Sequence, residues 1–302
     1  MKLASYWKGD ECRAALLDGE DLFDLHDSLK AAGAPTPVAD LKQFLSQQDW
    51  KGSLELLREL GRRSSPMALS SVRLAAPIPQ PGKLIMAGAN TFTHLKEAEP
   101  LVGNIPPSLN PMVLGKATSS VTGPNDDIIL PPETKKLDYE VEIGIVIGKT
   151  CRRQPESAVK DYIAGFLAMN DVSARDVQLA EGETATFYRT HFVGKSFDTF
   201  APMGPAITTV DEFEWGKPLR MRTFVNGELR QDGDTTDLCH GIERLVSYVS
   251  SAMTLQPGDI ISSGTPAGVA YFRDPPVFLT DGDVVICEVE GVGRVENRVR
   301  NG

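Results

Sequence analysis

The chain has 302 residues, 41% of them hydrophobic and 24% charged, which suits one large globular domain or a large and a small one. A formal net charge of −10 makes nucleic acid and anionic membranes poor partners, because an acidic surface repels both. No segment approaches the roughly 18 apolar residues of a membrane span, and the N-terminus lacks the apolar stretch of a signal peptide, so we expect a cytoplasmic protein. The cysteines are far apart, with no CxxC pair, and predict reduced thiols rather than a zinc site.

Residues 1–75 predict a small N-terminal α/β domain. Apolar patterning favours three strands and two helices there, at residues 3–6, 14–17, 22–25, 38–45 and 54–60. The connector at residues 76–82 is hostile to helix, because prolines alternate with other residues along it and lack backbone N–H donors. We therefore place a domain boundary there and expect residues 76–302 to form the larger domain.

Strand patterns dominate the larger domain. They occur at residues 83–86, 139–147, 219–225, 228–230, 260–261 and 284–289. Asn226-Gly227 is a type I′ hairpin signal, and apolar residues at helical spacing predict one helix over residues 238–253. We expect a β-rich domain of the α+β class, without a regular βαβ alternation.

The strand around residues 137–147 carries acids on one face and apolar residues on the other. Because side chains alternate along a strand, Asp138, Glu140 and Glu142 point the same way, roughly 7 Å apart in succession. Three arrangements relieve their repulsion: the face is open to water, each acid pairs with Lys or Arg, or a hard divalent cation binds among them. Asp171 ends an apolar run and is either a third metal ligand or a helix cap.

Three further segments carry polar groups that suit catalysis. If the segment after residue 90 is helical, His94 and Glu97 share one face and form either a general-base pair or a solvated pair. Lys195, near the start of a loop over residues 194–205, is placed to hold a substrate carboxylate or an enolate, or is a surface charge. Thr265 lies in a segment of small residues. This segment either lets backbone N–H groups approach an anion or is a plain loop.

Together these segments resemble the fumarylacetoacetate hydrolase (FAH) superfamily over roughly residues 83–300. The resembling motifs, in order, are Asn90-x-x-x-His94-x-x-Glu97; Lys116 with Ser119-Ser120 and Gly123-Pro124-x-Asp126; Asp138-Tyr139-Glu140-x-Glu142; residues 170–178 from Asn170 to Gln178; residues 195–200 from Lys195 to Phe200; Pro257-Gly258-Asp259; residues 264–269 from Gly264 to Val269; and Glu290-Gly291-x-Gly293 with Asn297. Their joint occurrence in this order identifies the chain as similar to that superfamily.

The resemblance implies a mixed β-sandwich roll in the larger domain, a homodimer, and Mg²⁺ or Mn²⁺ as cofactor. The residues that match the family's metal ligands are Glu140, Glu142 and Asp171, whereas Asp138 matches a position outside that set. The remaining site residues that the resemblance implies are the water-activating dyad of His94 and Glu97, the substrate contacts Lys195 and Gln178, the carboxylate-binding Thr265, and the supporting Arg175.

The resemblance also implies a small 2-oxo acid as substrate. We expect hydrolysis of a C–C bond in a 2,4-diketo acid such as an acylpyruvate, through a metal-stabilised enolate. The alternatives are a lyase or isomerase (oxaloacetate decarboxylase, sugar-acid dehydratase or hydroxymuconate isomerase) and, from another class, a binding module that keeps the fold. Three features depart from the family pattern and bear on substrate choice: Thr91 in place of tyrosine, Cys239-His240, and the segment from Glu181 to Arg189.

Overall fold

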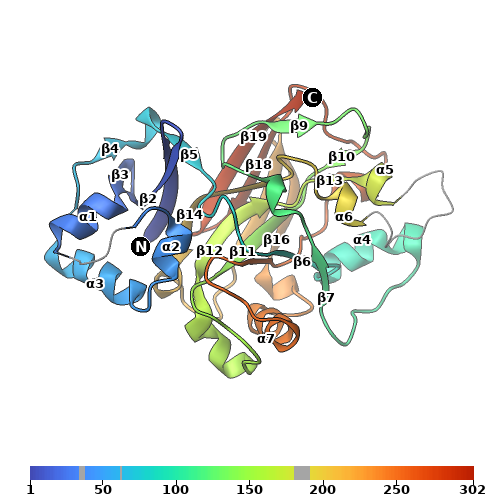
Figure 1. The fold of residues 1–302 in the computed structure, drawn as a ribbon. Coiled ribbons are helices and arrows are strands. Elements are labelled where there is room, and N and C mark those ends of the chain that lie inside the picture. The colour runs from blue at the N-terminus through green and yellow to red at the C-terminus, as the bar shows by residue number, and fades with distance from the viewer. Residues whose placement is uncertain (34–37, 62, 180–190) are drawn as a thin grey trace.

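A large mixed sheet runs through the computed structural model, which describes residues 1–33, 38–61, 63–179 and 191–302 (Figure 1). Across the sheet the strands are β4 (Met67–Ala68), β3 (Asp21–Asp24), β2 (Glu11–Asp18), β1 (Lys2–Lys8), β14 (Ala201–Thr209), β12 (Ile163–Asn170), β11 (Val141–Ile147), β17 (Ile260–Ser262), β6 (Leu84–Gly88) and β7 (Met112–Gly115), with β5 (Arg73–Ala75) beside β1 and β8 (Val121–Thr122) beside β14. The N-terminal strands therefore belong to the same sheet as the strands of the larger domain.

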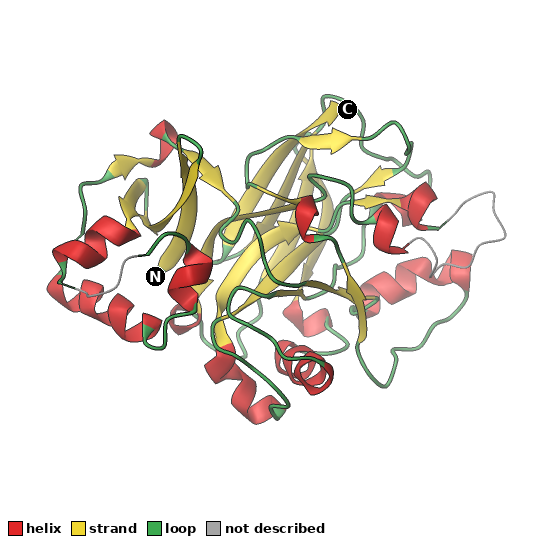
Figure 2. Ribbon diagram, viewed as in Figure 1, coloured by secondary structure: helices red, strands yellow, loops and turns green. Residues whose placement is uncertain are grey.

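A second sheet packs on the large one and closes the main core. Its order is β16 (Glu228–Asp234), β15 (Arg220–Val225), β18 (Val284–Val289), β19 (Gly293–Asn301) and β9 (Ile128–Leu130). Ile143 and Ile145 of β11 share this core with Met221 and Val285 of the second sheet. The expected β-rich α+β fold with a sandwich is confirmed (Figure 2).

The opposite face of the large sheet carries the N-terminal helices α1 (Leu25–Ala31), α2 (Leu41–Leu45) and α3 (Trp50–Leu60). Phe44 and Leu57 from these helices form a second core with Val146 and Leu167 of the sheet. Because β1 pairs with β14 antiparallel, the sheet crosses the boundary expected near residue 76. The division into residues 1–75 and 76–302 stays a prediction.

Several elements differ from the expected ones for local reasons. Helix α1 follows β3 directly, where only a strand was expected, because the Asp24 side chain accepts the N–H of Asp27 and caps the helix. Helix α7 (Ile242–Ala252) begins later than residue 238, because the backbone N–H groups of Cys239 and His240 bond to Asn90 instead. The hairpin at Asn226-Gly227 is confirmed, with φ of 51° and 82°.

Helices α4 (Phe92–Val102), α5 (Arg175–Gln178) and α6 (His191–Gly194) lie on the side of the large sheet where β7 forms its edge (Figure 1). The other short elements are the small sheet of β10 (Leu137–Asp138) and β13 (Ser173–Ala174), and the 3₁₀ turns η1 (Leu69–Ser71), η2 (Thr118–Ser120), η3 (Glu156–Tyr162), η4 (Val210–Glu212), η5 (Thr235–Asp237) and η6 (Ala270–Phe272), which are spread along the chain. The loop expected over residues 194–205 is shorter, because β14 begins at residue 201. None of the helices in the described ranges is long and apolar enough to cross a membrane.

Candidate active site

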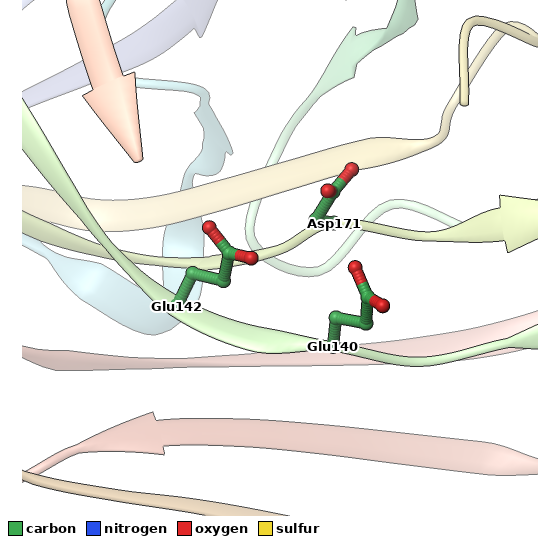
Figure 3. A group of neighbouring side chains, drawn as sticks. All are labelled: Glu140, Glu142 and Asp171. Carbon is green, nitrogen blue, oxygen red and sulfur yellow. The ribbon is translucent and has the colours of Figure 1, made fainter. Parts of the chain in front are cut away.

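Three buried carboxylates meet where β11 begins and β12 ends (Figure 3). The two strands are antiparallel and pair Val141 with Asn170, which brings the start of one beside the end of the other. Glu140 and Glu142 therefore lie next to Asp171, with ligand oxygens all within 4.8 Å of one another and side chains almost fully buried. The arrangement with the acids open to water is wrong, because Asp138, Glu140 and Glu142 are buried. The helix-cap role of Asp171 is also wrong, because Asp171 follows the strand β12.

Three buried cations surround this cluster. Lys195 Nζ lies 2.5 Å from both Glu140 Oε2 and Asp171 Oδ2. Lys116 Nζ lies 2.5 Å from the other oxygen of Asp171, and Arg175 Nη2 lies 2.5 Å from Glu140 Oε1. These charges fix Glu140 and Asp171 in place from several directions.

Asp138 belongs to the support and not to the cluster. Its carboxylate accepts the Arg175 Nε–H at 2.8 Å and the backbone N–H groups of Ala270 and Tyr271. Around this centre, four buried carboxylates thus face three buried cations, and in the described part of the chain no Lys or Arg forms an ion pair with Glu142. The buried excess of negative charge favours a further cation.

Glu142 is the group that carries this excess. Burial raises its pKa well above the usual 4.5, and the nearby carboxylates of Asp171 and Glu140 raise it further. Burial acts the same way on Glu140, but Arg175 and Lys195 outweigh it and lower the pKa of that carboxyl. A set of three carboxylate oxygens with one uncompensated charge fits a hard divalent cation, which prefers such ligands.

His94 and Glu97 form the expected pair on α4. The side chain of Thr91 accepts the N–H of His94 and caps the helix, so the departure from tyrosine at position 91 has a structural role. His94 Nδ1 lies 2.6 Å from Glu97 Oε1, and both side chains are about five-sixths buried, with 15% and 16% exposed. The second oxygen of Glu97 accepts the N–H of Gly268 at 2.7 Å, which holds the carboxylate against the histidine.

The remaining expected residues lie around the same space. Gln178 Oε1 accepts from Arg175 Nη1 at 3.1 Å, and Gln178 Nε2 lies 3.1 Å from His191 Nδ1. Burial and the neighbouring Lys195 lower the pKa of His191 to about 4. Thr265 is held at its hydroxyl by Gln231 Nε2 and at its carbonyl by the Thr91 hydroxyl.

One cavity of about 420 Å³ unites these groups. Eight of the nine site residues expected from the sequence line it, and the ninth, Glu97, lies behind His94. Residues without an assigned role in the sequence also contribute: Lys116 behind Asp171, Gln231 behind Thr265, and His191 on the wall. Lys116 stands in a recognised motif, but Gln231 has no sequence signal, because its role depends on β16 crossing behind the Thr265 loop. The unmapped residues 181–189 lie outside the described ranges.

The fold is β-rich, and its cavity is built around a buried cluster of three carboxylates. Residues 83–300 match the family described as fumarylacetoacetate (FAA) hydrolase C-terminal, so the chain belongs to that family and is an enzyme. Among curated proteins it is 43% identical to the mitochondrial oxaloacetate tautomerase Fahd2a of Rattus norvegicus, over 88% of this chain and 81% of that protein.

Solved structures agree with this assignment. Fumarylacetoacetate hydrolase from psychrophilic Exiguobacterium antarcticum is similar over 100% of both chains, with a TM-score of 0.81 and 32% identity. Maleylpyruvate hydrolase from Sphingobium sp. SYK-6, in complex with manganese(II) ion and pyruvate, is similar over 100% of both chains, with a TM-score of 0.78 and 29% identity.

Proposed function

We propose that the protein is a Mg²⁺- or Mn²⁺-dependent tautomerase that interconverts the keto and enol forms of a small 2-oxo acid such as oxaloacetate. The observation that carries the proposal is a carboxylate-held histidine in the same cavity as a buried cluster of three acids. Two comparisons support it: a relative named oxaloacetate tautomerase, and a similar structure in complex with manganese and pyruvate. Glu140, Glu142 and Asp171 would hold the metal.

The reaction moves one proton between carbon and oxygen. A bound divalent cation supplies Lewis-acid polarisation of the 2-oxo group. Glu97 engages Nδ1 of His94, which leaves Nε2 to take the proton from C3 as the C3–H bond breaks. The electron pair of the C3–H bond forms the C2–C3 double bond, and the π pair of the C2 carbonyl moves onto its oxygen. The proton then passes from Nε2 to that oxygen, so the enol forms without any other reactant.

Other residues of the cavity orient the acid and stabilise the charge that develops. Lys195 is ammonium in the folded protein, because Asp171 and Glu140 raise its pKa in spite of burial, and it would face the developing negative charge. The hydroxyl of Thr265 is held by Gln231 and is suited to donate to the substrate carboxylate. Gln178 and Arg175 would set the position of that end.

Hydrolysis of a C–C bond in a 2,4-diketo acid stays a second candidate. The same Nε2 of His94 can take a proton from water, and the Sphingobium relative is named a hydrolase. In that reaction a water oxygen bonds to C4, the C3–C4 bond breaks, and the proton goes to C3. The two candidates therefore share every residue and differ in what the base deprotonates.

The deciding experiment gives purified, metal-loaded protein the enol form of oxaloacetate and acetylpyruvate in parallel. We expect the enol absorbance to decay faster with enzyme and Mg²⁺ or Mn²⁺ than with metal alone, and His94→Gln to remove the difference. Acetate release from acetylpyruvate, with no acceleration of the oxaloacetate enol, would reverse the order of the two candidates. Pyruvate formation is followed in the same samples to detect decarboxylation.

The homodimer and the cytoplasmic location stay predictions. The rat relative's name places that protein in mitochondria, so location needs its own measurement in cells. Light scattering coupled to size-exclusion chromatography tests the homodimer, because a monomer of 32.8 kDa is easily distinguished from a dimer of twice that mass.

A further inference from the structure

We propose that the cavity continues into a second subsite that takes an alkyl or aryl substituent of the 2-oxo acid. This inference rests on the proposed function and names the class of side chain that the substrate carries. The subsite, called here the apolar wing, is the part of the cavity lined by Leu95, Ala98, Ile105, Met112 and Leu114.

The wing is built from α4 on one side and β7 on the other. In β7, Met112 and Leu114 both line the cavity, whereas Val113 between them packs into the main core. β7 pairs with β6 so that Gly88 lies opposite Met112. A Cβ at position 88 would lie 2.4 Å from Met112 Cε and 3.0 Å from Leu114 Cδ1, so glycine there leaves room for both side chains.

The chemistry of the wing differs from that of the metal end. Among residues that the structure describes, the charged groups of the cavity lie at the carboxylate cluster, and the wing's own side chains are all apolar. A second carboxylate placed in the wing would lose hydration without gaining a partner. A methylene placed there would leave water, which is favourable. The wing therefore selects for uncharged substituents.

The size and outlet of the cavity allow a chain of some length. A volume of about 420 Å³ lies within the range of sites that hold drug-sized ligands, whereas a four-carbon acid would occupy the metal end alone. Ile105 is 48% exposed, so the wing opens to water at this residue. The segment that carries Ile105 is anchored from outside, because His240 Nε2 lies 3.0 Å from the Ser108 carbonyl oxygen.

The experiment measures binding of non-reacting 2-oxo acid analogues to the Mn²⁺-loaded protein by calorimetry. The ligands are oxamate, a series of N-alkyloxamates of increasing chain length, and an N-(carboxyalkyl)oxamate with a second carboxylate. We expect each added methylene to tighten binding by roughly three- to fourfold until the chain reaches solvent, and the second carboxylate to cancel that gain.

Paired variants locate the effect on one strand. In Leu114→Asn the affinity for N-alkyloxamates should no longer rise with chain length. Met112→Gln should have the same effect and replaces the first variant if that one does not fold. Val113→Thr, a polar exchange on the same strand, should leave the dependence intact. Affinity that is independent of chain length in the unchanged protein would overturn the wing while leaving the 2-oxo acid site in place. Failure of oxamate itself to bind would overturn the proposed function and the wing with it.

Discussion

Glu97 holds His94 with one carboxylate oxygen, 2.6 Å from Nδ1, and uses its other oxygen to accept the N–H of Gly268. Gly268 belongs to the same loop as Thr265, so the base and the expected carboxylate-binding hydroxyl are tied together. The carboxylate orients the imidazole and favours the tautomer in which Nδ1 is protonated and Nε2 is basic.

This pair predicts a specific defect. Glu97→Gln should lower kcat about 10- to 100-fold, because a neutral amide stabilises the protonated imidazole less than a carboxylate does. The affinity for Mn²⁺ should stay the same, since Glu97 does not reach the carboxylate cluster. Steady-state rates and Mn²⁺ titration check both halves, with Glu99→Gln on the exposed face of the same helix as the control. An unchanged kcat would remove Glu97 from the reaction.

The ammonium group of Lys195 lies between two expected metal ligands and would repel a bound cation. Because its ammonium lies 2.5 Å from Glu140 and from Asp171, Lys195→Met should tighten Mn²⁺ binding, by roughly tenfold, since a repelling unit charge a few ångströms away is lost. Turnover should fall in the same variant, because that charge no longer faces the substrate. Calorimetry measures the affinity for Mn²⁺, and steady-state rates measure the turnover. Lys96→Met, at an exposed position, is the matched control. Weaker Mn²⁺ binding would show that Lys195 organises the ligands instead.

The raised pKa of Glu142 predicts how metal stabilisation depends on pH. In the unfolded chain this carboxyl loses its proton near its usual 4.5, whereas the folded, metal-free protein keeps the proton to higher pH. The metal-free protein therefore loses stability as pH rises through the raised folded pKa, and a bound cation, which needs the carboxylate, reverses the loss.

The gain in Tm on adding Mn²⁺ should thus be larger at pH 8 than at pH 5.5. Thermal unfolding with and without metal measures it at each pH. Glu142→Gln, which cannot titrate, should show a small gain that no longer varies with pH. A gain in the unchanged protein that is constant across this range would separate Glu142 from metal binding.

Arg175 is expected to matter for stability as well as for the site. It is buried and bonds to Asp138, Glu140 and Gln178, so Arg175→Met leaves two buried carboxylates short of a partner. Such a loss costs about 3–5 kcal/mol of unfolding free energy, which urea unfolding measures. Arg220→Met, which breaks an exposed pair with Asp232, should change it little. Equal effects of the two would mean that water reaches Asp138 and Glu140.

The sequence predicted that the acids share one face of the strand, but not which positive groups compensate the charge of each carboxylate. Alternation along the strand placed Ile143 and Ile145 in the core and Glu140 and Glu142 opposite, as the structure has them. Pairing with Lys or Arg, the second of the three arrangements, is present for Asp138 and Glu140. That Glu142 forms no ion pair with the Lys and Arg side chains of the described residues follows from the three-dimensional structure alone, because Lys116, Arg175 and Lys195 are distant from it in sequence.

Boundaries and supporting residues were less predictable for the same reason. The start of α7 depends on Asn90, far away in the chain, which takes the backbone N–H groups of Cys239 and His240. Gln231 looks like any polar strand residue, yet its side chain fixes Thr265. Local patterns carry propensity and alternation, whereas these roles arise from tertiary contacts.

An anomalous difference map from crystals soaked in Mn²⁺ tests directly whether Glu140, Glu142 and Asp171 hold the metal. We expect one strong peak bonded to oxygens of Glu140, Glu142 and Asp171, at roughly 2.0–2.3 Å, with Lys195 moved aside from at least one carboxylate. Fully active protein at saturating Mn²⁺ that shows no peak among these three acids would contradict this expectation.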